Sequence, residues 1–75
     1  MPKLPSITGS EAVDAFCRAG FVIARQSASH VILKKEGNRN HLSIPVHAGK
    51  NIGKGLLKNQ IDKSGLTVKE FCELL

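Results

Sequence analysis

Residues 41–47 alternate strictly between polar and apolar side chains, a pattern typical of a β-strand with one buried face. The alternation directs three aliphatic side chains toward a core: Leu42, Ile44 and Val46. Pro45 has no N–H to donate to a neighbouring strand, so this strand must lie at a sheet edge or end there. A sheet with one apolar face needs a second layer of structure to cover that face. The sequence therefore predicts a two-layer fold.

Two other β-rich segments come before this strand, at residues 21–26 and 30–35. Ser27-Ala28-Ser29 has the composition of a turn between them. Residues 36–40 contain Gly and Asn, which can adopt positive φ in a hairpin loop. We therefore expect three antiparallel strands connected by hairpins.

Helical patterns lie on both sides of these strands. Thr8 and Glu11 have the spacing of a capping box, and a following glycine can end a helix over residues 9–19. A second helix follows a flexible basic loop at residues 48–55, and a second capping box at Thr67 opens a short last helix. The predicted fold class is α+β, in the order α-β-β-β-α. It has a three-stranded antiparallel sheet, helices on one face and a short C-terminal helix.

The size of the chain limits it to one modest core. We expect a single domain over residues 1–75, because a chain of this length buries only about 60% of the surface that its unfolded form exposes. Its 41% hydrophobic and 23% charged residues are typical of a soluble globular domain, and no apolar run is long enough for a membrane span or a signal peptide. Cys17 and Cys72 fit no metal or redox spacing, so we interpret both as buried thiols of a cytoplasmic protein.

The positive charge is concentrated in the middle of the chain. The net charge is +5, and residues 34–63 alone carry seven basic and two acidic side chains, which also gives +5. Residues 1–33 have a net charge of +1 and residues 64–75 a net charge of −1. Such a concentration indicates a polyanionic partner, whereas the alternative is a solvated surface with incidental lysines.

The loop before the second helix and the start of that helix form the clearest candidate anion site. Gly53 and Gly55 allow the backbone to approach a ligand closely, and a helix N-terminus presents unpaired N–H groups. Lys50, Lys54 and Lys58 recur every four residues, so the last two would share a helix face. The loop lacks the pattern of a P-loop, and the alternative is a loop with no ligand.

Three histidines are the obvious candidates for proton transfer near neutral pH. On the strand alternation, His30 lies with Ile32 and Lys34 on the open face of the sheet. His41 and His47 share the outward face of the next strand, and His47 directly precedes the basic loop. For each of the three the alternative is an inert, solvated histidine, and His47 could also contact phosphate.

No cysteine–histidine group has zinc spacing and no carboxylates cluster for magnesium, so we expect neither a metal nor another cofactor. A single histidine without a metal suits RNA cleavage, in which the 2′-hydroxyl of the substrate is the nucleophile. The protein then has to supply proton transfer and phosphate stabilisation. Two other functions stay open: a noncatalytic double-stranded-RNA-binding module, and an interaction protein whose lysines bind an acidic partner.

Several short segments, in this order and spacing, resemble the HicA toxins, which are also called the YcfA-like family. They are Gly20-Phe21, Arg25-Gln26, Ser29-His30, Pro45-Val46-His47-Ala48-Gly49-Lys50, Gly55-Leu56-Leu57 and Gly65-Leu66. The similarity covers essentially the whole chain. It implies a fold like that of double-stranded-RNA-binding domains, cleavage of mRNA independent of the ribosome, and neutralisation by a HicB antitoxin.

The resemblance also implies roles for particular residues. The catalytic histidine of the family follows a Gly-Ser pair at the start of the second strand, which corresponds to His30 here, although this chain has Ala28 in place of the glycine. The family often has Thr where this chain has Leu56. We therefore expect His30 to act as general acid/base in a metal-independent endoribonuclease. The expected phosphate contacts are Lys50, Lys54, Lys58, His47 and the backbone from Gly53 to Gly55, with Lys34 as a further contact.

Overall fold

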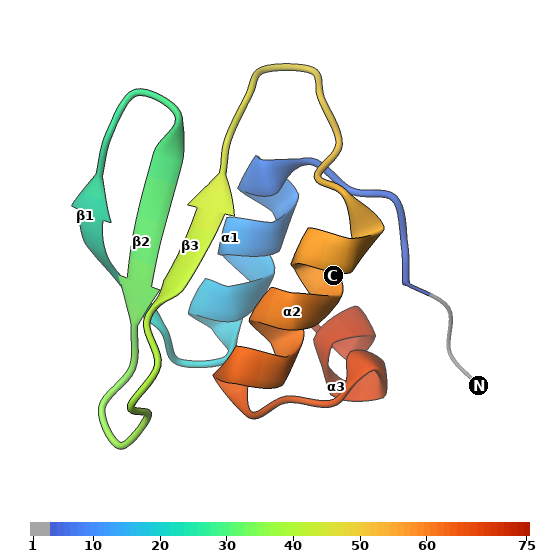
Figure 1. Ribbon diagram of the computed structural model, residues 1–75. Helices are drawn as coiled ribbons and strands as arrows, with labels where there is room; N and C mark the ends of the chain where they lie inside the picture. The colour runs from blue at the N-terminus through green and yellow to red at the C-terminus, as the bar shows by residue number, and fades with distance from the viewer. Residues whose placement is uncertain (1–3) are drawn as a thin grey trace.

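A computed structural model describes residues 4–75 and confirms the predicted order of helices and strands. The elements are α1 (Gly9–Arg18), β1 (Val22–Gln26), β2 (His30–Lys34), β3 (Leu42–Pro45), α2 (Lys54–Ser64) and α3 (Val68–Glu73). The strands form one antiparallel sheet in the order β1-β2-β3, and the helices lie on one side of it (Figure 1). The α+β fold class is therefore confirmed.

The edge position of β3 follows from its proline. β3 pairs only with β2, in a register that places Pro45 opposite His30, and the strand ends at Pro45. The prediction that this strand is an edge or ends at Pro45 is confirmed, because a residue without an N–H can occupy a strand only where no ladder bond is needed. β1 forms the other edge and contains a bulge between Ile23 and Arg25.

Local signals set the limits of α1. The Thr8 hydroxyl accepts a hydrogen bond from the Glu11 N–H at 3.2 Å, and the Glu11 carboxylate accepts one from the Thr8 N–H at 3.0 Å. At the other end Gly20 has φ of 105°, and the Phe21 N–H donates to the Phe16 carbonyl at 3.1 Å. The rings of Phe16 and Phe21 meet edge to face with their centroids 5.9 Å apart. The predicted capping box and glycine terminus are confirmed.

The core fills the space between the sheet and the helices. Its largest fully buried side chains are Phe16, Phe71, Leu33, Leu42, Ile44, Leu57 and Ile61. On β2, Val31 and Leu33 are buried whereas His30 and Lys34 are exposed, as the alternation predicts. The polar face of β2 is therefore open to solvent and available to a ligand.

The second helix begins earlier than predicted. Lys54 and Gly55 belong to the first turn of α2, with Gly53 as the N-cap, and are not part of the preceding loop. The end of that loop is also tied down: Ile52 is buried, and its N–H donates to the Ile7 carbonyl at 2.9 Å. This backbone bond to the N-terminal segment holds the start of α2 in place.

The prediction of two buried cysteines is wrong: Cys17 is exposed and Cys72 is only half-buried. The buried stripe of α1 includes Ala12 and Ala15, which turns Cys17 outward. Partial desolvation raises the pKa of the Cys17 thiol, and the negative charge of Asp14 raises it further by a smaller amount. Neither cysteine forms a disulfide.

Candidate functional site

His30 is the first residue of β2, and its side chain is exposed on the open face of the sheet. Hydrogen bonds fix the backbone on both sides of it. The Val46 N–H donates to the Ser29 carbonyl at 2.8 Å, and the Ser27 N–H donates to the His30 carbonyl at 2.8 Å. The imidazole is therefore reachable by a ligand, while the chain that carries it is held by the neighbouring strand.

The His30 ring has a neighbour that sequence reasoning did not assign. The Ser29 hydroxyl lies 3.2 Å from Nδ1, and within residues 4–75 this is the only hydrogen bond of the ring. Adjacency in the sequence and the Ser29-His30 segment of the family resemblance are the signals that could have indicated this contact. Ala28 at this turn has negative φ, as do all other non-glycine residues that the structure describes. The turn before His30 therefore does not require a glycine at that position.

A β-turn brings together two of the predicted phosphate-binding residues. The Lys50 N–H donates to the His47 carbonyl at 3.1 Å, and Gly49 has φ of 73° at the third position of the turn. The ends of such a turn lie within about 7 Å of each other. Because His30 lies directly opposite Pro45, this turn begins beside the histidine at the same end of the sheet.

The N-terminus of α2 is the segment for which the sequence predicts an anion site. Its N-cap, Gly53, makes no side-chain cap hydrogen bond, and the first turn contains no acidic residue. Lys54 and Gly55 are both exposed there. The free N–H groups of a first helical turn carry partial positive charge and can bind an anion. The segment therefore has the features on which the predicted anion site rests, and the site itself stays a prediction.

His30 and the start of α2 lie on different faces of the sheet. His30 is on the open face, whereas α2 packs against the buried face of β3. The loop between β3 and α2 passes from the end of the sheet to the helix layer (Figure 1). His47 and Lys50 are therefore next to the histidine side, whereas Lys54 is on the helix side.

Lys58 shares the exposed face of α2 with Lys54, but its charge is already paired. Its ammonium lies 2.7 Å from the Asp62 carboxylate, one helical turn further on. Both side chains are about half exposed, so solvent screens this pair and its contribution to stability is small. The carboxylate nevertheless reduces the positive potential that an approaching anion meets at Lys58.

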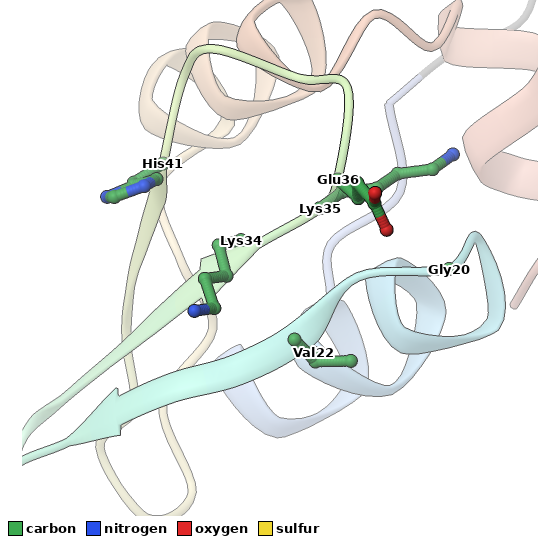
Figure 2. Close-up of a pocket in the computed structure, with 6 residues that line it drawn as sticks. All are labelled: Gly20, Val22, Lys34, Lys35, Glu36 and His41. Atoms are coloured by element: carbon green, nitrogen blue, oxygen red, sulfur yellow. The ribbon is translucent and has the colours of Figure 1, made fainter.

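Lys34 lies far from the other predicted phosphate contacts. It lies at the opposite end of β2 from His30, and four residues along a strand correspond to about 13 Å. A surface hollow of about 540 Å³ surrounds it, lined by Gly20, Val22, Lys34, Lys35, Glu36 and His41 (Figure 2). The structure thus places the predicted contacts in three locations: His47 and Lys50 near His30, the start of α2 with Lys58 in the helix layer, and Lys34 alone at the far end of β2.

The described residues contain neither a cluster of metal-binding side chains nor a membrane-spanning helix. No three His, Cys, Asp or Glu side chains in residues 4–75 come close enough together to hold a metal ion. None of the three helices in that range has the length and apolar content needed to cross a membrane.

Comparison with known proteins identifies the family of this chain. The model of the family described as the HicA toxin of bacterial toxin-antitoxin systems matches residues 9–66. This range includes the sheet, the basic loop and all of α1 and α2. No curated protein matches the chain significantly. The chain belongs to the HicA toxin family, and the resemblance seen in the sequence is confirmed.

Proposed function

From its membership in the HicA toxin family, we propose that this protein is an mRNA endoribonuclease that acts without the ribosome. Family membership supports the toxin role. The single observation that supports the chemistry best is the exposed imidazole of His30 on a fixed strand, beside a basic turn that contains Lys50. An accessible acid/base group next to positive charge is what phosphodiester cleavage requires.

The proposed reaction uses the substrate as its own nucleophile. The 2′-oxygen of a ribose attacks the adjacent phosphorus, the bond to the 5′-oxygen of the next nucleotide breaks, and a 2′,3′-cyclic phosphate forms. His30 takes the proton of the 2′-hydroxyl as general base and, once protonated, can return it to the departing 5′-oxygen. Such proton transfer typically contributes about 10²- to 10⁴-fold in rate.

Positive groups around the histidine would hold the phosphates. His47 and Lys50 lie in the turn that follows β3 at the His30 end of the sheet, and they would contact the reacting region. Lys54 and the backbone from Gly53 to Gly55 would bind phosphate at the N-terminus of α2, with Lys58 as a weaker contact. Lys34, at the other end of the sheet, would contact a more distant part of the same RNA. No metal or cofactor takes part in the proposed reaction.

The alternative is a noncatalytic double-stranded-RNA-binding module. The α-β-β-β-α fold and the basic N-terminus of α2 favour it, because such modules bind the RNA backbone and its shape. Incubation of the purified protein with labelled RNA in EDTA distinguishes the functions. Cleavage supports the proposed enzyme, and a mobility shift without cleavage supports the alternative. If the RNA is neither cleaved nor shifted, a role in protein interaction is what remains.

A toxin of this family has an antitoxin partner. We propose that the partner is a HicB-like protein that presents carboxylates to the region from Lys50 to Lys58 and shields His30. Such a partner would associate rapidly by electrostatic steering and would compete with phosphate for the same side chains.

A further inference from the structure

We propose that Ser29 is a positioning residue that sets the orientation and the tautomer of the His30 ring; this inference rests on the proposed role of His30. The observation behind it is the 3.2 Å separation between the Ser29 hydroxyl and Nδ1 of His30. The Nε2 atom has no hydrogen-bond partner in the described part of the chain. One ring nitrogen is thus held by the protein, and the other is left to the substrate.

The chemistry of the two groups explains why this contact matters. A neutral imidazole carries one N–H, and it can act as a base at Nε2 only when the proton is on Nδ1. In the arrangement we propose, Nδ1–H donates to the serine oxygen and Nε2 is left free to take a proton. After Nε2 has taken a proton, the Nδ1–H bond to the serine persists. The ring therefore does not have to rotate during the proposed reaction.

The surrounding structure gives Ser29 a fixed position from which to act. Its carbonyl accepts a hydrogen bond from the Val46 N–H at 2.8 Å, which ties it to the end of β3. Ser29 is also half-buried, whereas the two residues before it are exposed. Ser27 in the same turn provides a matched control, because its hydroxyl contacts the His30 carbonyl at 3.3 Å and not the ring.

The test compares Ser29→Ala and Ser27→Ala with the parent protein, by steady-state cleavage of labelled RNA and by ¹⁵N NMR of the His30 ring. For Ser29→Ala we expect kcat to fall about 3- to 10-fold, because the variant loses one hydrogen bond to the catalytic ring. KM and the midpoint of unfolding should not change. Ser27→Ala should retain the parent kcat. In the NMR spectra, the Nδ1–H tautomer of His30 should dominate in the parent protein and in Ser27→Ala. Its population should fall in Ser29→Ala.

The isosteric pair Ser29→Thr and Ser29→Val covers the case in which alanine disturbs the turn. Threonine should keep the parent kcat and tautomer, whereas valine should lose both. Equal kcat and equal tautomer populations in these two variants would overturn the proposal. His30→Ala tests the function separately: if that variant cleaves RNA like the parent, the proposed catalytic role fails, while the NMR comparison still reports whether Ser29 sets the tautomer.

Discussion

The side-chain oxygen of Gln60 on α2 accepts a hydrogen bond from the backbone N–H of Ser43 on β3 at 3.0 Å. Because β3 is an edge strand, this N–H has no partner strand on that side. Gln60 is only 4% exposed and Ser43 is half-buried, so the bond is partly shielded from water. A polar residue on the buried face of α2 thus joins the helix to the sheet and holds the basic N-terminus of α2 beside the loop.

Replacing Gln60 with Leu should destabilise the protein. The Ser43 N–H would lose its partner at a half-buried position, which costs about 0.5–1.5 kcal/mol in the free energy of unfolding. Urea denaturation measures this change, and Asn59→Leu, at an exposed position of the same helix, is the control. Equal losses in both variants would show that the hydrogen bond is not the cause.

A Gly9→Ala substitution should also destabilise the fold, by an overlap between backbones. A Cβ atom at Gly9 would overlap the carbonyl oxygen of Pro45, because the first turn of α1 packs directly against the end of β3. We expect a loss of about 1–3 kcal/mol, typical of overpacking. Gly55→Ala is the control, since its Cβ would meet nothing within 4 Å and alanine favours a helix. A Gly9→Ala protein as stable as the parent would contradict this close packing.

Replacing His30 with Ala should abolish RNA cleavage and leave the fold intact. The side chain is exposed, so the free energy of unfolding should change by no more than about 0.5 kcal/mol. His41→Ala, at the other end of the sheet, should retain cleavage activity. A folded His30→Ala protein with the parent cleavage rate would assign the chemistry to another group or refute the enzymatic function.

Lys50→Ala and Lys54→Ala should each weaken RNA binding to a similar extent for all sequences, because phosphate contacts carry no base information. Each lost contact should reduce the slope of log K against log salt by about 0.7–0.9. Lys58→Ala should have a smaller effect because Asp62 already pairs with it, and Lys69→Ala on α3 is the control. A salt slope near zero in the parent protein would mean that the positive charge serves another ligand.

An antitoxin that acts by occlusion should protect the site from hydrogen exchange. In the complex we expect slower amide exchange in residues 28–34 and 47–58, where the partner would cover His30 and the basic loop. Measurement of the toxin alone and in the complex checks this. Protection confined to α1 and α3 would instead indicate a partner bound to the helices that acts by distortion.

Much of the fold could be predicted from the sequence because its signals act over a few residues. The capping boxes at Thr8 and Thr67 and the glycine ends of α1 and α2 depend only on neighbouring backbone groups. The alternation along β2 and β3 determined which side chains face the core and therefore placed His30 on the open face. Local geometry sufficed for these predictions.

What only the tertiary structure decided depends on contacts between distant segments. Cys17 matched the helical spacing of the core, but packing buries a neighbouring stripe of α1 and leaves that thiol exposed. Lys34 belongs to the same charged region of the sequence as Lys50, yet the direction of β2 carries it away from the basic loop. The Gln60–Ser43 bond joins residues seventeen positions apart. Periodicity specifies which face a side chain occupies, but the position of one element against another depends on how the core packs.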